Sequence, residues 1–334
     1  MKRWVAVAVL LMGLLPGMMR QSTPTGMWDA RDPELYLYQF GEKKTLPAGQ
    51  GKVVYFTKYT KLSLTADAAI SASLVALTEG TAATPGVISA TRLTATAQGY
   101  GAAVGLSDFL IMTAINDTVT GALGEVSKVL ALRMEQVIEG TLSAQGTIIR
   151  GSAVAANAVT TATPIFATDI IRSVTTLRST DAKTFPDGNF VGRFHPNQIH
   201  QLQTDTKTGG WIDVVKYTSN VDRAYRGEIG QLYGVRAVMS SNVPLVVSDA
   251  NNSVALTAGA LGSGYMAYIF GPGAYGVVDL EGGSASTYVK QLGSGGTSDP
   301  LNQLATVGAK VYFAALNIDQ TNRFIRLIGG NVLT

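Results

Sequence analysis

Residues 117–142 read DTVTGALGEVSKVLALRMEQVIEGTL and contain the most regular hydrophobic pattern of the chain. Its apolar residues recur at steps of three and four positions: Val119, Leu123, Val126, Leu130, Met134, Val137 and Ile138. This spacing places them on one side of an α-helix, with Glu125 and Lys128 on the other. At about 1.5 Å per residue, such a helix is roughly 39 Å long. The pattern therefore predicts one long amphipathic helix, within a helical region that covers residues 108–144.

After this helix the chain alternates between shorter helix and strand patterns. Residues 167–179 predict a second helix, capped by Thr168 or Asp169, and residues 197–203 predict a short third one. Segments rich in β-branched and aromatic residues predict strands at 190–194, 235–240, 265–270, 276–280, 286–292, 305–316 and 323–328. Helices mixed with scattered strands predict an α+β fold and not a strictly alternating α/β fold.

The residues before the long helix predict two projections from the body of the protein. Residues 52–60 and 87–107 both read as strands, and the long connection between them favours a protruding β-hairpin. Residues 20–50 are interrupted by proline and glycine and follow neither a helical nor a strand period. This stretch carries the aromatic residues Trp28, Tyr36, Tyr38 and Phe40, so we expect an extended arm that lies on another surface.

The composition of the 334 residues excludes several kinds of chemistry. The chain has no cysteine, which excludes disulfides, thiolate nucleophiles and cysteine-ligated metal clusters. It has two histidines, too few for a multi-histidine metal centre, and its net charge of +3 is too small to indicate a nucleic-acid-binding protein. Charged residues make up only 15%, against about 25% in ordinary soluble domains. Low charge favours a subunit whose outer faces meet copies of itself.

No motif in the sequence gives positive support for catalysis, a cofactor or a metal. Residues 271–276 match the glycine spacing of a dinucleotide-binding loop, but a strand pattern follows where that motif requires a helix. We interpret them as a turn. His195 and His200 are five residues apart, which does not fit a metal pair on one helix face. Asp205, Asp213 and Glu228 are carboxylates without an evident partner. We therefore expect no enzymatic activity, no catalytic residue, no cofactor and no metal.

The N-terminal residues 1–26 allow two interpretations. A basic start and a 12-residue apolar run are typical of a secretory signal, although no small-x-small cleavage site follows. The run is too short for a standard transmembrane helix. The alternative interpretation is a structural arm that is retained in the mature protein.

Two long stretches of sequence resemble a known family. One is DGNFVGRFHPNQIHQLQTD at 187–205, continuing through WIDVVKY at 211–217 to GEIGQLYGVR at 227–236. The other is FGPGAYGVVDL at 270–280, followed by KQLGSGGTSDPLNQLATVGAK at 290–310. Both resemble the major capsid proteins of tailed bacteriophages, in the branch typified by the coliphage N-four capsid protein, which have the Hong Kong 97-type shell fold. The order of the elements also fits this family from about residue 50 to 330.

The resemblance implies a division of the chain into five parts. It implies an N-terminal arm at 1–50, an extended loop at 51–107, and a peripheral domain with a long spine helix at 108–164. An axial domain at 165–270 and return strands of the peripheral domain at 271–334 complete the subunit. Residues 1–26 depart from the usual start of the family, and residues 241–264 resemble an insertion in the axial domain.

The resemblance also implies function, partners and location. It implies a self-assembling icosahedral shell, with copies of the chain in hexamers and pentamers, around a double-stranded DNA genome that is contacted weakly and without sequence specificity. Separate scaffold, portal and decoration proteins, assembly in the host cytoplasm, and no membrane partner are further expectations. Because a phage shell assembles in the cytoplasm, residues 1–26 are expected to be retained. Candidate inter-subunit contacts are Trp28, Tyr36, Tyr38, Phe40, Val54, Phe56, Lys58 and Arg92.

Two other functions compete with this interpretation. The N-terminus and the Thr/Ala/Gly-rich composition also fit a secreted or outer-membrane β-rich surface protein, although the long amphipathic helix argues against it. A protein nanocompartment shell of the same fold is the second alternative. It would lack the long N-terminal arm and would carry protein cargo in place of DNA.

Overall fold

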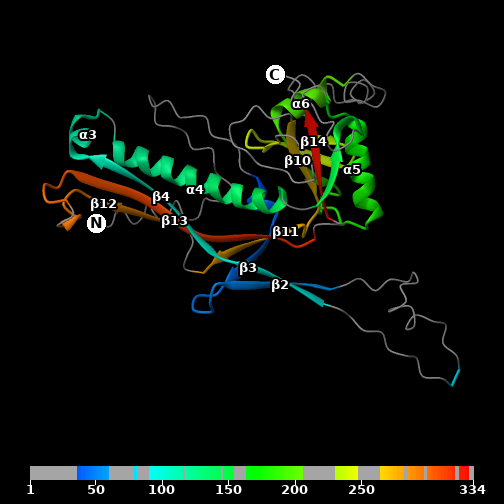
Figure 1. Cartoon of the computed structure of the whole chain (residues 1–334), viewed down its shortest axis with the longest axis horizontal. Helices are drawn as coiled ribbons and strands as arrows, with labels where there is room; N and C mark the ends of the chain where they lie inside the picture. The colour runs from blue at the N-terminus through cyan, green and yellow to red at the C-terminus, as the bar shows by residue number, and fades with distance from the viewer. Residues whose placement is uncertain are drawn as a thin grey trace.

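The structure is a computed structural model of the chain. It describes residues 36–59, 79–80, 90–115, 117–143, 146–153, 163–205, 230–246, 264–281, 285–296, 299–319 and 323–330. Trp28, residues 1–26, the centre of the 51–107 loop, Asp213, Glu228 and most of the predicted 241–264 insertion lie outside these residues. Within the described residues the molecule is elongated, with a sheet-and-helix lobe at one end and a long helix lying over a second sheet at the other (Figure 1).

The first lobe is built on a seven-stranded mixed sheet in the order β5-β14-β10-β6-β8-β7, with β9 also paired to β10. Its strands are β5 (Thr147–Arg150), β6 (Phe190–Phe194), β7 (Gln231–Leu232), β8 (Val235–Met239), β9 (Leu245–Val246), β10 (Gly264–Phe270) and β14 (Phe324–Gly330). The central strands are buried on both faces because helices or other segments cover each side. A short 3₁₀ turn, Gly151–Ala153, follows β5.

Helices α5 (Ala167–Ser179) and α6 (Pro196–Gln203) cover one face of this sheet. Side chains of β10 alternate between the two faces: Ala267 and Ile269 meet α5 and α6, whereas Met266, Tyr268 and Phe270 point to the opposite core. The α5 bounds match the prediction, but the N-cap is Phe166 and not Thr168 or Asp169. Asp169 stands at the third helical position, where its Oδ2 accepts a hydrogen bond from the Phe166 N–H at 3.1 Å.

The second sheet has five strands in the order β1-β11-β13-β12, with β4 also paired to β13. Its strands are β1 (Glu42–Leu46), β4 (Gln98–Ser107), β11 (Tyr275–Leu280), β12 (Ser286–Lys290) and β13 (Leu304–Asn317). The long strand β13 forms the axis of this lobe: its N-terminal half pairs with β12 and β4, and its C-terminal end pairs with β11. Helix α4 lies along the sheet (Figure 1).

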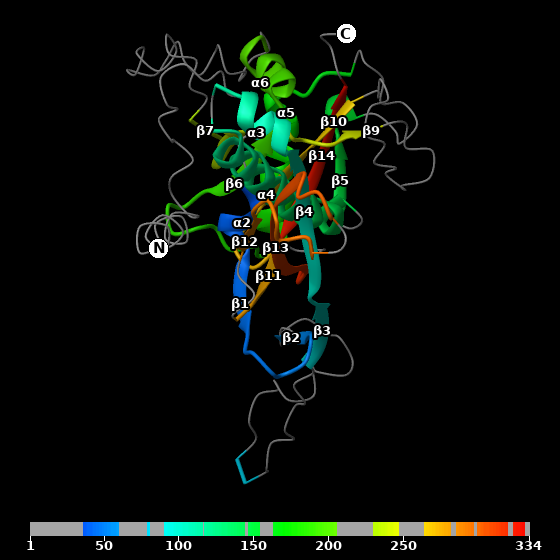
Figure 2. The same ribbon diagram turned by 90° about the vertical axis from the view of Figure 1, so that its left-hand side faces the viewer.

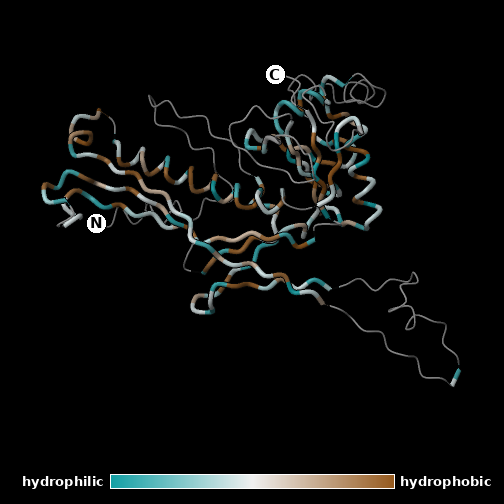
Figure 3. The backbone as a smooth tube through the Cα atoms, in the orientation of Figure 1, coloured by the Kyte–Doolittle hydropathy of each residue, from teal (hydrophilic) through white to brown (hydrophobic). Residues whose placement is uncertain are grey.

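Helix α4 (Thr118–Ser143) is the long helix that the sequence predicts. Asp117 caps it, because its Oδ1 accepts hydrogen bonds from the Val119 and Thr120 N–H groups. The predicted stripe faces the core, and hydrophobic and hydrophilic residues alternate along the helix in Figure 3. The predicted helical region 108–144 contains two helices, because a separate α3 (Asp108–Thr113) precedes α4. Ser107 begins α3 by accepting the Leu110 N–H.

Strands β2 (Val53–Tyr59) and β3 (Ala90–Thr96) form an antiparallel pair, as expected for the base of a hairpin. The predicted strand pattern at 87–107 contains two strands, since β3 ends at Thr96 and β4 begins at Gln98. Figure 2 shows β2 and β3 at the end of the molecule away from the seven-stranded sheet. The base of the hairpin therefore lies on the five-stranded lobe.

Residues 36–46 differ from the predicted arm, which was expected to lack regular structure. They form α2 (Leu37–Phe40) and β1, and β1 pairs in parallel with β11. Leu37 is fully buried, because α2 packs against α4 and the aromatic residues of the central core. This segment is part of the subunit's own core, since its partners come from residues more than 90 positions away.

The predicted α+β class is confirmed. The two sheets divide the chain differently from the predicted domain boundaries: β5 and β14 come from ranges assigned to the peripheral domain but pair in the seven-stranded sheet. The assignment of functional domains stays a prediction.

Candidate inter-subunit surfaces and the buried charge cluster

The predicted contact residues of the N-terminal segment meet their own chain. The Tyr38 hydroxyl donates a hydrogen bond to Asp279 Oδ2 at 2.5 Å, and burial together with this carboxylate raises the pKa of Tyr38. The Phe40 ring contacts the rings of Phe185 and Phe270 with centroids 5.7 and 5.9 Å apart. The Tyr36 N–H donates to Glu135. Their part in contacts between subunits stays a prediction.

The hairpin strand β2 presents two different faces. Val54, Phe56 and Lys58 point toward the body, where the Phe56 side chain is 2% exposed against Val278 and Ala314. Lys58 Nζ lies 2.9 Å from Asp319 Oδ1, so an ion pair fastens the strand to the end of β13. These three predicted contact residues hold the base of the hairpin on its own subunit.

The outward face of the hairpin carries residues that the sequence analysis did not single out. Tyr55 and Tyr59 are 54% and 69% exposed, and the Arg92 guanidinium lies over the Tyr55 ring at 5.9 Å. Of the four predicted hairpin residues, only Arg92 belongs to this face. The signal that could have found the tyrosines is the two-residue period of a strand, which puts them opposite the buried Phe56.

A second exposed apolar surface lies at the far end of the five-stranded lobe, around α3 (Figure 1). We call it the tip patch; it comprises Phe109, Leu110, Met112, Ile115, Leu301 and Leu304, each at least 44% exposed. The Asp108 N–H donates to the Gln303 carbonyl, which joins the two stretches of chain that contribute to the patch. Large exposed apolar patches are typical of interaction sites. The helical stripe of the sequence begins only at Val119, so its pattern gives no sign of this patch.

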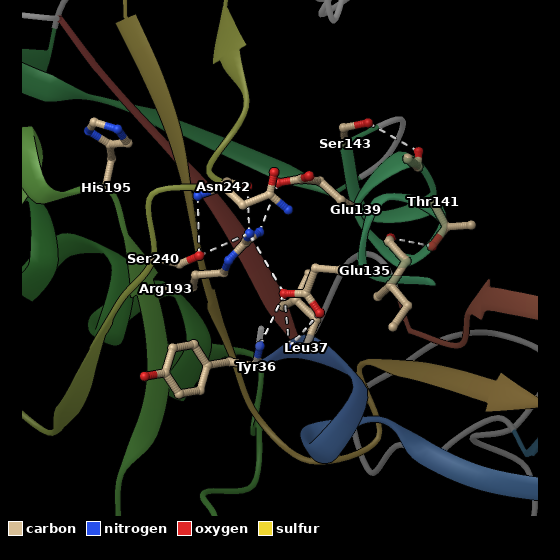
Figure 4. A network of polar contacts seen from close by, with 12 residues as sticks. Tyr36, Leu37, Glu135, Glu139, Thr141, Ser143, Arg193, His195, Ser240 and Asn242 are labelled. Carbon is tan, nitrogen blue, oxygen red and sulfur yellow. Dashed lines mark hydrogen bonds and ion pairs between the residues drawn. The ribbon is translucent and has the colours of Figure 1, made fainter. Parts of the chain in front are cut away.

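The junction between the two lobes contains a buried charge cluster (Figure 4). Arg193 of β6 is 1% exposed, and its Nη1 lies 2.8 Å from Glu139 Oε1 of α4. Its Nη2 lies 3.7 Å from Glu135 Oε1 and donates to the Asn242 carbonyl at 2.5 Å and to Ser240 Oγ at 3.4 Å. Three separate parts of the chain are thus joined through one guanidinium.

Glu135 extends this cluster to the N-terminal segment. Its carboxylate oxygens accept hydrogen bonds from the Tyr36 and Leu37 N–H groups at 3.1–3.2 Å. These amides stand at the start of α2, where N–H groups have no acceptor within the helix itself, and a carboxylate is a suitable acceptor for them. Removing one partner of a buried ion pair costs about 3–5 kcal/mol, so this cluster makes the lobes and the segment depend on one another.

The sequence contains a sign of this cluster. Arg193 interrupts an otherwise apolar strand, and the two glutamates are four residues apart on one side of α4. An arginine in a buried strand needs an acidic partner, and a pair of acids spaced by one helical turn can supply it.

The remaining polar motifs have structural roles. Residues 271–274 form the predicted turn into β11, and no helix starts there. His195 caps α6, with Nδ1 accepting the Asn197 N–H, and its ring stacks on Tyr265 at 3.7 Å. Burial lowers the pKa of His195 to about 4. Asp205 Oδ2 accepts the Ala167 N–H at the start of α5.

No helix in the described part of the chain is both long and apolar enough to span a membrane. None of its residues form a group of three or more histidine, aspartate or glutamate side chains that could hold a metal ion.

Comparison with known proteins gives a consistent result for the fold. No family model matches the chain, and no curated protein matches it. Among solved structures, the capsid of the cyanophage P-SCSP1u is 17% identical with a TM-score of 0.63, and the match covers 94% of each chain. The capsid of Ralstonia phage GP4 is 12% identical with a TM-score of 0.65, covering 94% of this chain and 96% of the other. A structure from Mycobacterium phage Che8 is 13% identical with a TM-score of 0.62, covering 93% and 97%. The chain therefore has the fold of phage capsid structures, as the sequence resemblance predicts.

Proposed function

We propose that this chain is the major capsid protein of a tailed bacteriophage and self-assembles into the icosahedral shell that encloses a double-stranded DNA genome. The observation that carries the proposal is the extent of the structural likeness. It covers more than nine tenths of the chain and more than nine tenths of each of these capsid structures, so it is not confined to one lobe.

The surface of the subunit supports assembly with copies of itself. The tip patch and the outward tyrosines of the hairpin expose apolar and aromatic side chains at separate ends of the molecule. Two such surfaces allow one subunit to contact several neighbours at once, as a closed shell requires. A charged fraction of 15% fits a protein with much of its surface in contacts.

The finer features of the proposal follow from the sequence resemblance. The subunits would form hexamers and pentamers, assembled in the host cytoplasm with separate scaffold and portal proteins and decorated by further proteins. DNA contact would be weak and salt-sensitive, through scattered Lys and Arg side chains. The predicted inter-subunit contacts of the arm and hairpin belong to this proposal, with Tyr55 and Tyr59 added to them.

Assembly of the purified full-length chain tests the proposal. Electron microscopy of the wild-type chain should show closed shells or tubes. Met112→Asp places a charge in the tip patch, at a side chain that is 79% exposed. Burying that charge between subunits should lower the shell yield by about tenfold or more. A loss of about 1.4 kcal/mol in the binding free energy of one contact already lowers its equilibrium constant tenfold. Val129→Asp is the matched control, because Val129 is an exposed apolar residue of α4, outside the tip patch.

The outcomes distinguish the alternatives. Particles that carry protein cargo in place of DNA would indicate a nanocompartment shell. A chain that stays monomeric under all assembly conditions, also with the other proteins of its phage, would overturn the proposal. A normal shell yield from Met112→Asp would remove the tip patch from the contact surface and leave the proposed function standing.

A further inference from the structure

The buried charge cluster contains more negative than positive charge. Glu135 and Glu139 are 1% and 6% exposed, lie one helical turn apart on α4, and face the single guanidinium of Arg193. The distances are unequal, because Arg193 lies 2.8 Å from Glu139 but 3.7 Å from Glu135. A buried, unbalanced carboxylate is costly, and uptake of one proton by the pair removes the imbalance.

Among the described residues, no carboxylate other than Glu135 and Glu139 themselves acts on these two glutamates. From β10 the buried Tyr268 faces Glu139, and from β11 the buried Tyr275 faces Glu135. Burial raises the pKa of both tyrosines, so they remain neutral. Arg326 of β14 donates to the carbonyl oxygens of Ser143 and Gly146 near the end of α4. The N-terminal segment contributes its amides to Glu135 and the Leu37 carbonyl, which accepts the Tyr275 hydroxyl at 2.6 Å.

We infer that the Glu135–Glu139–Arg193 cluster is a proton-sensitive latch, which holds residues 36–41 against α4 more firmly when Glu139 is protonated than when it is ionised. The geometry gives the reason. With Glu139 neutral, the guanidinium charge balances Glu135 alone, and Glu135 keeps its hydrogen bonds to the segment. With both glutamates ionised, opening of the segment lets water reach Glu135 and relieves the excess charge. The inference concerns the single chain and does not depend on shell assembly.

The direction of the pH effect follows from the same groups. Burial is the largest influence on Glu139 and raises its pKa to about 7, with the charge of Glu135 adding to the rise. When the segment opens, water reaches the pair and the pKa returns toward its ordinary value. The closed state therefore binds the proton more tightly, and opening becomes easier as the pH rises toward 7. We expect the equilibrium constant for opening of residues 36–41 to increase by up to about tenfold per pH unit and to level off above about pH 7.

Hydrogen exchange of the full-length free chain tests the latch. The readout is the protection of the amides of residues 36–41 between pH 5 and pH 8, corrected for the pH dependence of intrinsic exchange. Protection should fall as the pH rises in the wild-type chain. Glu139→Gln keeps a side-chain oxygen for Arg193 but cannot ionise, so its protection should be higher and should depend less on pH than in the wild type. A smaller dependence at the acid end remains, because burial also raises the pKa of Glu135. Glu125→Gln is the matched control on the same helix, at an exposed side chain paired with Lys128, and should behave as wild type.

Either of two results would overturn the inference. One is a pH dependence in Glu139→Gln equal to that of the wild type. The other needs no variant and remains decisive if Glu139→Gln fails to fold: corrected protection of residues 36–41 in the wild-type chain that stays constant, or rises, from pH 5 to pH 7.

Discussion

At the scale of single residues, the packing of the Phe56 ring requires a glycine at position 276. A Cβ atom at Gly276 would lie 2.6 Å from Phe56 Cζ, closer than packed atoms approach. The backbone of β11 thus makes room for the ring that anchors the hairpin base. Any side chain at position 276 would push β2 away from the five-stranded sheet. The packing of β2 against this sheet therefore depends on the glycine.

His195 gives a prediction for pH dependence at the same scale. Its folded-state pKa of about 4 lies below the ordinary 6.5, because burial disfavours the charged ring. The unfolded chain therefore binds this proton at a higher pH than the folded chain. The stability that results is complete above pH 6.5 and is lost as the pH falls toward 4. His195→Asn keeps a cap acceptor for Asn197 but does not titrate.

Urea unfolding at pH 4.5 and pH 6.5 measures this contribution. The variant should lose less stability than the wild type when the pH is lowered, although loss of the ring stacking on Tyr265 makes it less stable overall. Glu139 acts in the opposite direction over part of this range, so only the difference between the two chains isolates His195. Identical pH slopes in both chains would contradict the assignment.

The sequence predicts residues well where the local pattern determines them. The interpretation of the glycine motif as a turn is correct for residues 271–274, since Pro272 and the strand pattern that follows are local features. Arg193 was not recognised as a junction residue, because its partners lie 47 and more positions away and only the fold brings them together. Long-range polar clusters leave little trace in the neighbouring sequence.

At the scale of elements, the hairpin follows the alternation of a strand. Its even-numbered residues on β2 pack on the subunit, and its odd-numbered residues face outward. The sequence predicts the hairpin, and its assignment of Val54, Phe56 and Lys58 to contacts between subunits stays a prediction. The aromatic and β-branched pattern identifies a strand without indicating which side meets its own core.

Tyr59→Ala tests the outward face. The side chain is 69% exposed, so its removal should change the free energy of unfolding of the subunit by less than about 0.5 kcal/mol. The shell yield should fall several-fold, since exposed tyrosines frequently dominate binding energy at protein contacts. Thr57→Ala, on the same face of the same strand, is the matched control and should assemble normally. Light scattering and thermal unfolding give the two readouts, and normal assembly of Tyr59→Ala would exclude this residue from the interface.

The two helices α3 and α4 show another limit of prediction from sequence. Residues 108–115 are apolar and helical in composition, so they merge with the long helix in a periodicity analysis. The separation comes from capping: Asp117 satisfies the first amides of α4 and stops the helix from extending backward. Because α3 is separate, its apolar side chains are left exposed in the tip patch.

At the scale of the whole molecule, the N-terminal segment completes the five-stranded sheet and part of the hydrophobic core. Leu37 and Leu46 are 0% and 4% exposed, and β1 forms the edge of the five-stranded sheet. The α+β class, the long helix and most strand positions could be predicted from the sequence. The parallel pairing of β1 with β11, and the entry of β5 and β14 into the other sheet, depend on contacts that no local pattern encodes.

A pair of truncated chains tests the role of this segment. One starts at residue 36 and the other at residue 47, so that they differ only in residues 36–46. The shorter chain should be less stable by at least about 3 kcal/mol, from the loss of two buried leucines at about 1.5–3 kcal/mol each. Denaturant unfolding of both chains measures the difference, and equal midpoints would show that the segment does not stabilise the fold.

The distance along the chain between Leu37 and Tyr275 has a consequence for biosynthesis. Their hydrogen bond joins residues 238 positions apart, and α2 leaves the ribosome long before its partners on β11 exist. At about 5–20 residues per second, the nascent N-terminal segment waits roughly 10–50 seconds for these strands. During this time its apolar side chains are uncovered, so folding is completed only near the end of translation. The uncovered segment is therefore open to aggregation and to chaperone binding while synthesis is still under way.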